Sequence, residues 1–125
     1  MDRNILIVGI GGFLGSICRY LVAVLSASYV TPGFPFATFA VNIGGCFLIG
    51  ILFALSEKGN VLAPELRVFL TTGFCGGFTT FSTFSYESIK LLQGGEFLYV
   101  ALNIVLSVLI GFAATYIGIL IVKSL

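Results

Sequence analysis

The sequence has no histidine, only three cysteines and few charged residues, and each shortage excludes a class of site. Without histidine, most zinc and haem sites are excluded. Cys18, Cys46 and Cys75 lie inside apolar segments, without the spacing of metal ligands or of a disulfide framework, and we interpret them as small core residues. Because the net charge is +1 and no run of lysine or arginine occurs, a nucleic-acid-binding surface is also excluded.

Apolar residues dominate the rest of the composition. Hydrophobic residues make up 58% of the 125 residues, charged residues make up 9%, and the mean hydropathy is +1.16. A soluble domain carries about 25% charged residues. The uncharged stretches between the charged side chains are long enough to cross a bilayer. The composition therefore predicts a membrane protein with the lipid bilayer as its solvent.

The chain has room for four membrane helices, because each crossing takes about 20 apolar residues. We predict an all-α membrane protein in which residues 1–125 form a single four-span domain. The expected helices cover about 5–29, 36–56, 66–92 and 97–122, with connections at 31–35, 57–65 and 93–96. The connections contain the prolines, glycines and polar residues that do not continue a helix.

A cleaved signal peptide is the alternative for the first apolar segment, because the small residues Ser26-Ala27-Ser28 follow it. We disfavour this alternative, since Arg19 would interrupt the apolar region of such a peptide and three more spans follow.

The charge bias between the two membrane sides is weak. With four spans both termini share one side, which collects Arg3, Lys58, Arg67 and Lys123, while the other side has Lys90. So few charges allow insertion in both orientations. A four-helix protomer fills its own centre with side chains, so a transport function suggests an oligomer.

Small residues recur at helical spacing, as in Gly11-xxx-Gly15 of the first span and Cys46-xxx-Gly50 of the second. Such residues let helix backbones approach closely, and we expect most of these contacts within the protomer.

The third span has an unusual centre, where Gly76-Gly77 is followed by Thr79-Thr80. Glycine is about 1 kcal/mol worse than alanine in a helix, and hydroxyls can bond carbonyls that a break frees. We expect this helix to break at mid-membrane, between Gly76 and Thr79. Non-helical backbone at that depth is tolerated where it is buried in protein or lines a wet cavity. A kinked structural helix is the alternative.

Aromatic and hydroxyl residues alternate after the expected break. Phe81 and Phe84 are spaced i, i+3, as are Ser82 and Ser85, so two stripes run along one helix. The positive edge of a phenyl ring can face an anion without holding it as tightly as a charged residue would. The alternative, which spacing alone favours, is that the rings pack or face lipid.

Polar residues also occur deep in the second and fourth spans. Asn42 lies in the second span, and Asn103, Ser107, Gly111 and Thr115 form one i+4 stripe in the fourth. Neutral amides and hydroxyls suit a site that passes a small hydrated anion, since they replace water without trapping the ion. Hydrogen bonding between helices is the alternative use of these groups.

Arg19 and Glu87 are charged residues within the expected spans. Arg19 falls near the middle of the first span, where a charge costs about 3 kcal/mol, and we interpret it as structural or electrostatic. Glu87 ends the uncharged part of the third span. It is either an acid at a pore mouth or an interface residue that pairs with Lys90 at i+3.

These segments together resemble the Fluc (CrcB) family of fluoride channels. The resemblance rests on the run from Gly73 to Ser85, on Asn42-Ile43-Gly44-Gly45 and on Gly11-Gly12-xx-Gly15-xxx-Arg19, and it covers nearly the whole chain. It implies a passive, fluoride-specific channel that lowers cytoplasmic fluoride and so protects against fluoride toxicity. It also implies a multi-pass protein of the inner membrane of a bacterium or archaeon, built as an antiparallel dual-topology homodimer.

The resemblance also implies roles for single residues. Phe81 and Phe84 match the phenylalanine pair of the family's pore, Asn42 matches its asparagine, and Glu87 matches its acid after the motif. Arg19 matches the arginine of the family's first helix. The other residues that we assign to the fluoride pore on this basis are Thr80, Ser82, Thr83, Ser107 and Thr115.

A structural sodium ion, not transported, is the cofactor that the resemblance implies. Its ligands would be the backbone carbonyls of Gly76 and Thr79 at the dimer centre. The fourth span departs from the family pattern, because Gly111 interrupts the track of hydroxyls. Asn103 stands where relatives often carry a larger aromatic or imidazole group.

A proton-coupled cation antiporter of the small multidrug type is the alternative function, since it is also a short four-span protein. It needs a membrane-embedded carboxylate in its first helix, whereas the only charge of the expected first span is Arg19. A non-transporting assembly subunit is a further alternative, and the broken third span disfavours it.

Overall fold

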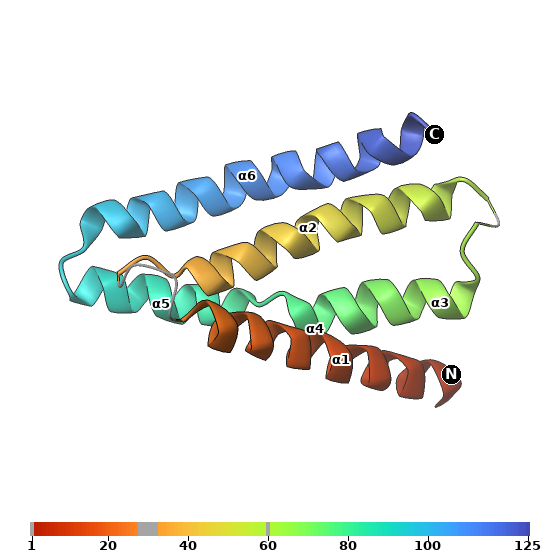
Figure 1. Ribbon diagram of the computed structural model, residues 1–125, viewed down its shortest axis with the longest axis horizontal. Coiled ribbons are helices and arrows are strands. Elements are labelled where there is room, and N and C mark those ends of the chain that lie inside the picture. The colour runs from red at the N-terminus through yellow and green to blue at the C-terminus, as the bar shows by residue number, and fades with distance from the viewer. Residues whose placement is uncertain (1, 28–32, 60) are drawn as a thin grey trace.

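The structure, a computed structural model, describes residues 2–27, 33–59 and 61–125, and all regular elements in these ranges are helical. The expected all-α class is confirmed for this part of the chain. Figure 1 shows long helices beside a helix that is divided. The elements are α1 (Asp2–Ser26), α2 (Phe36–Glu57), α3 (Pro64–Val68), η1 (Phe69–Cys75), α4 (Gly76–Phe78), α5 (Phe81–Gln93) and α6 (Phe97–Lys123).

Three of these helices are long and apolar enough to cross a membrane. They are α1 from Arg3 onward, α2 and α6, with 24, 22 and 27 residues. Large apolar side chains cover their outer faces, and Phe13 of α1 and Leu98 of α6 are 65% and 70% exposed. Such exposure fits lipid as the surrounding solvent. The remaining expected span is the divided helix from α3 to α5.

The observed helix ends differ from the expected ones in several places. α1 begins at Asp2 and ends at Ser26, earlier than expected at both ends. The expected end at Tyr29, the first part of the turn at 31–35 and Asn60 of the polar connection lie outside the described residues. Pro64 opens α3 instead of closing a loop, because proline lacks an N–H that the first helical turn would leave unbonded anyway.

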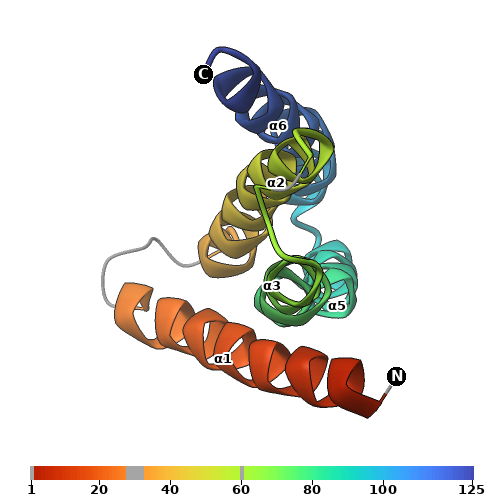
Figure 2. The same ribbon diagram turned by 90° about the vertical axis from the view of Figure 1, so that its right-hand side faces the viewer.

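The divided helix lies between α1 on one side and the α2–α6 pair on the other (Figure 2). Glycines allow these approaches. A methyl group on Gly15 of α1 would overlap the carbonyl oxygen of Phe74, and one on Gly50 of α2 would overlap that of Thr115. The expected packing of small residues within the protomer is therefore found.

Candidate functional site

The divided helix breaks at Thr79 and Thr80, whose backbones are extended (φ −93°, ψ 159° and φ −153°, ψ 119°). The expected break began at Gly76, but Gly76–Phe78 is helical and forms α4. The observed break thus begins at the last residue of the expected stretch, and Gly77 meets a packing requirement instead of marking the break. A methyl group there would come within 2.5 Å of the Gly12 carbonyl oxygen.

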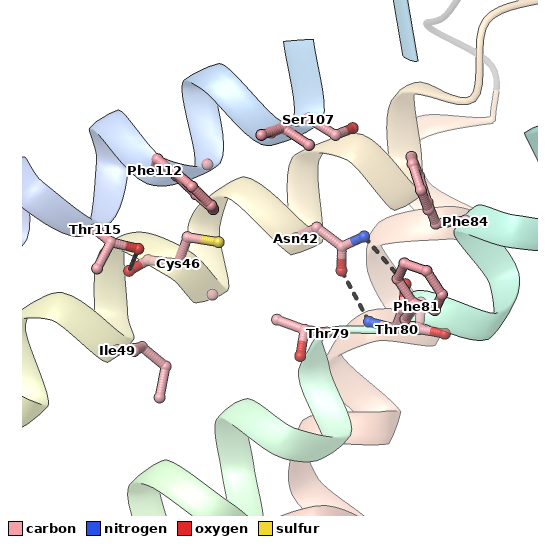
Figure 3. A pocket seen from close by; sticks show the side chains of 13 residues that line it. Asn42, Cys46, Ile49, Thr79, Thr80, Phe81, Phe84, Ser107, Phe112 and Thr115 are labelled. Carbon is pink, nitrogen blue, oxygen red and sulfur yellow. Dashed lines mark hydrogen bonds between the residues drawn. The ribbon is translucent and has the colours of Figure 1, made fainter. Parts of the chain in front are cut away.

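Asn42 of α2 stabilises the extended backbone of the break through two hydrogen bonds. Its Oδ1 accepts from the Thr80 N–H at 2.8 Å, and its Nδ2 donates to the Thr80 carbonyl at 3.1 Å (Figure 3). The side chain thus satisfies both backbone groups of one extended residue, as a neighbouring strand would. This pairing joins α2 to the break and explains why the chain leaves the helical conformation at this residue.

Thr80 then starts α5. Its Oγ1 accepts from the Thr83 N–H at 3.2 Å, which is an N-terminal cap. The same hydroxyl donates to Thr83 Oγ1 at 3.2 Å and lies 3.3 Å from Ser82 Oγ. The other threonine of the break, Thr79, donates its hydroxyl proton to the Cys75 carbonyl at 2.9 Å.

The break leaves backbone carbonyls without their usual partners. Arg19 Nε donates to the Gly77 carbonyl at 3.0 Å, so this arginine is the hydrogen-bond partner of one of these carbonyls. In the described part of the chain, no hydrogen bond reaches the carbonyls of Gly76, Phe78 and Thr79. Arg19 therefore contacts the backbone of the break. The carbonyl oxygens of Gly76 and Thr79, which the resemblance assigns to sodium, have no hydrogen-bond donor among the described residues.

A cavity of about 370 Å³ lies beside the break, between α2, α5 and α6 (Figure 3). None of its described lining residues is charged. The lining consists of Asn42, Gly45, Cys46, Ile49, Thr79, Thr80, Phe81, Phe84, Ser107, Val108, Gly111, Phe112 and Thr115.

The cavity brings together most of the residues that the sequence assigned to the pore. Asn42, Thr80, Phe81 and Phe84 line one end. The rings of Phe81 and Phe84 have centroids 5.6 Å apart at an angle of 43°, and Phe81 is 78% exposed. The two rings thus lie side by side, as their spacing predicted, and Phe81 packs against little of its own chain.

The hydroxyls of the lining differ in whether their protons are free. Thr115 donates its proton to the Cys46 carbonyl at 3.0 Å. Ser107 donates to Asn103 Oδ1 at 3.4 Å, which is long for such a bond. Asn42 has a second amide proton beyond the one given to Thr80. An anion needs hydrogen-bond donors. The strongest free donor in the lining is the second amide proton of Asn42.

The hydroxyl residues of α6 do not form a continuous track along the cavity, because Gly111 lies between Ser107 and Thr115. Gly111 is buried, and a methyl group on it would come within 3.4 Å of Cys46 Sγ. The thiol of Cys46 thus fills the space that a larger side chain at position 111 would take. Cys46 was missed as a lining residue, although it lies one turn after Asn42 on the same face of α2.

Three of the assigned residues lie outside the cavity lining. Ser82 and Thr83 reach Thr80 but do not line the cavity. Glu87 Oε2 accepts from Thr38 Oγ1 at 3.1 Å, while its Oε1 is buried without a partner among the described residues. Thr38 was missed from the sequence, although it precedes Asn42 by one turn.

An ion pair between Glu87 and Lys90 was one of the two alternatives that the sequence left open for Glu87. It does not form among the described residues. Lys90 lies over the ring of Tyr86 instead, with its Nζ 5.9 Å from the ring centroid.

Several curated proteins are similar to this chain over almost its full length. The profile described as "CrcB-like protein, Camphor Resistance (CrcB)" matches residues 6–119. A curated protein of Chlorobium luteolum named "Fluoride-specific ion channel FluC" is 52% identical over 120 residues, which cover 96% of this chain and 92% of the relative. Proteins of the same name from Flavobacterium psychrophilum and Geotalea daltonii are 49% and 46% identical, covering 98% and 94% of this chain and 99% and 94% of the relatives.

These relatives are bacterial, and three described helices are long and apolar enough to span a membrane. The chain is therefore a multi-pass bacterial membrane protein. Because the profile matches far more than half of the sequence and the relatives are aligned over nearly all of it, the chain belongs to the CrcB family.

Proposed function

We propose that this protein is a passive channel specific for fluoride, which lowers cytoplasmic fluoride and so protects the cell from its toxicity. The observation that carries the proposal is the cavity at the helix break, which combines neutral donors with phenyl rings and has no charged residue in its described lining. The name of the relatives, fluoride-specific ion channel, supports the choice of ion.

The chemistry of this lining suits an ion that must enter and leave quickly. Fluoride holds its water tightly, so the channel has to replace water with donors. The Asn42 amide is such a donor, and the positive edges of Phe81 and Phe84 add a weaker attraction. A lysine or arginine in the lining would bind the anion too strongly for release.

An antiparallel, dual-topology homodimer is the assembly that we propose. The cavity of one chain is open where Phe81 is exposed, so a second copy would complete its wall. The basic residues that would set the orientation are few, which is consistent with insertion in both orientations.

A structural sodium ion would lie between the two copies of the break. The fit is favourable, because the carbonyls of Gly76 and Thr79 are hard oxygen donors that no described residue hydrogen-bonds. The ion would be coordinated by these oxygens and would not be transported. Replacing sodium by N-methylglucamine should dissociate the dimer, and an intact, fully active dimer in that medium would contradict this role.

A proton-coupled cation antiporter is disfavoured. Between Arg3 and Ser26, α1 contains no acidic residue that could exchange a proton for a cation within the membrane. The relatives are also named as ion channels, not as exchangers or enzymes.

The test is fluoride efflux from liposomes that contain the purified protein, measured with a fluoride electrode beside chloride efflux. We expect rapid fluoride efflux and far slower chloride efflux. Phe81→Ile and Phe84→Ile retain apolar bulk and remove the ring edge, so each should reduce fluoride efflux by about ten-fold, the loss of one weak contact of about 1.4 kcal/mol. Size-exclusion chromatography establishes that the variants assemble. Parent-like efflux in both assembled variants would show that the rings only pack.

A further inference from the structure

Three polar side chains form a hydrogen-bonded chain between α5 and α6. Asn103 Nδ2 donates to Ser88 Oγ at 3.0 Å, and Ser107 Oγ donates to Asn103 Oδ1 at 3.4 Å. Asn103 is 1% exposed and Ser88 is 8% exposed, so the surroundings offer them few other partners. Only Ser107 lines the cavity. The proposed function leaves Asn103 and Ser88 without a role.

The direction of these bonds decides what Ser107 offers to an ion. A hydroxyl has one proton. While Ser107 gives this proton to Asn103, it presents only lone pairs to the cavity, and lone pairs repel an anion. The Ser107 bond, at 3.4 Å, exceeds the usual range for hydroxyl donors, so little stabilisation is lost when it is exchanged.

The carboxamide of Asn103 can make the same two contacts with its ends exchanged. In that arrangement the Ser88 hydroxyl donates to Oδ1, and Nδ2 donates to Ser107 Oγ, so each group keeps a partner. The Ser107 proton is then free to point into the cavity. Because hydrogen bonds in a chain polarise one another, Ser107 also becomes a stronger donor.

We propose that Asn103 is a positioning residue that controls, through the orientation of its amide, whether Ser107 donates a proton to the anion in the cavity. The inference rests on the proposed function, since the anion is fluoride. The conducting arrangement is the one in which Nδ2 faces Ser107. The described arrangement, in which Oδ1 faces Ser107, is the resting one.

Substitutions on the two sides of this chain have opposite expected effects. Asn103→Leu removes the amide at similar volume. The Ser107 hydroxyl should then donate its proton to the backbone carbonyl one turn earlier in the helix. Fluoride efflux should fall about ten-fold, as for the loss of one hydrogen bond to an ion. Ser88→Ala removes the acceptor of Nδ2. Because a buried N–H tolerates the loss of its partner less well than a carbonyl does, the amide should turn Nδ2 toward Ser107. Efflux of this variant should equal or exceed that of the parent.

A double substitution shows whether Asn103 acts through Ser107. Asn103→Leu should have no further effect once Ser107→Ala has been introduced. The control is Ser56→Ala in α2, which removes a hydroxyl that bonds the Leu52 carbonyl at 2.9 Å outside the cavity and should leave efflux unchanged. All rates are fluoride efflux per assembled dimer in liposomes.

Equal losses in Asn103→Leu and Ser88→Ala would overturn the inference, because they would mean that Asn103 only clamps α5 to α6. A full Asn103→Leu effect in the Ser107→Ala background would also overturn it. If Asn103→Leu does not assemble, Ser88→Ala decides alone: reduced efflux contradicts the inference, and parent-like or faster efflux supports it. A parent protein without fluoride efflux would contradict the proposed function instead, so the two failures are distinguishable.

Discussion

At the residue scale, Asn42 is the side chain on which the break depends most. It bonds both the N–H and the carbonyl of Thr80, a residue 38 positions later in the chain. The same amide carries the second proton that an anion could accept. One side chain therefore links the shape of the backbone to the chemistry of the cavity.

We expect Asn42→Leu to reduce both stability and conduction. The substitution leaves two backbone groups of Thr80 without partners, and each such buried group costs about 1–3 kcal/mol. The melting temperature of the purified protein should fall, and fluoride efflux should drop by at least about ten-fold, because a donor to the ion is also lost. Asn4→Ala, at an exposed position of α1, is the control that removes an amide elsewhere. Unchanged melting and efflux in Asn42→Leu would mean that Asn42 neither holds the break nor contacts fluoride.

Cys46 offers a test of whether ions pass through the cavity. Of the three cysteines, Cys46 alone lines the cavity, while Cys75 is buried elsewhere. A small thiol reagent that reaches Cys46 should obstruct the cavity and stop fluoride efflux. Cys46→Ala should be resistant, and Cys18→Ala should remain as sensitive as the parent. Inhibition that survives Cys46→Ala would place the reactive thiol, or the ion path, elsewhere.

At the scale of elements, the glycines of α1 decide how closely it approaches the divided helix. We expect Gly15→Ala to lower the melting temperature, because its methyl group would overlap the Phe74 carbonyl and such overpacking costs about 1–3 kcal/mol. Gly12→Ala is the matched control, since its methyl group would lie 3.7 Å from the Gly73 carbonyl, an ordinary contact. Equal melting temperatures for the two variants would show that α1 does not pack as described.

Much of this architecture could be predicted from local patterns, and the remainder depends on contacts between distant segments. Apolar length located the helices, and the Gly-Gly and Thr-Thr pairs located the break to within about one turn. The break falls at Thr79 and Thr80, at the end of the expected stretch and not at its glycines, because Asn42 on another helix bonds the Thr80 backbone. Ser88 had no visible signal, since a serine in a helix reveals its partner only when α5 packs on α6.

At the scale of the whole molecule, Phe81 lines the cavity of one chain and is nevertheless 78% exposed. The charges that normally set the orientation of a membrane protein are few. Both features are explained if two copies insert in opposite directions and complete one another.

We therefore expect both orientations in a single membrane. A terminal tag on this protein should be accessible to an impermeant label from each side of the membrane in similar amounts, and cross-linking should join chains of opposite orientation. One uniform orientation in cells would contradict the antiparallel dimer. Added lysines at the C-terminus, next to Lys123, should bias insertion toward one orientation and reduce the number of active dimers.

The break between Phe78 and Phe81 also divides one helix macrodipole into two. In an uninterrupted helix, the partial charges at these residues would cancel along the axis. Here the α3–α4 segment ends with its negative pole inside the protein, and α5 begins there with its positive pole, each equivalent to about half an elementary charge. Two extended threonines thus place a negative pole, at which Arg19 donates to the Gly77 carbonyl, next to a positive pole that attracts an anion. None of the described residues that line the cavity is charged.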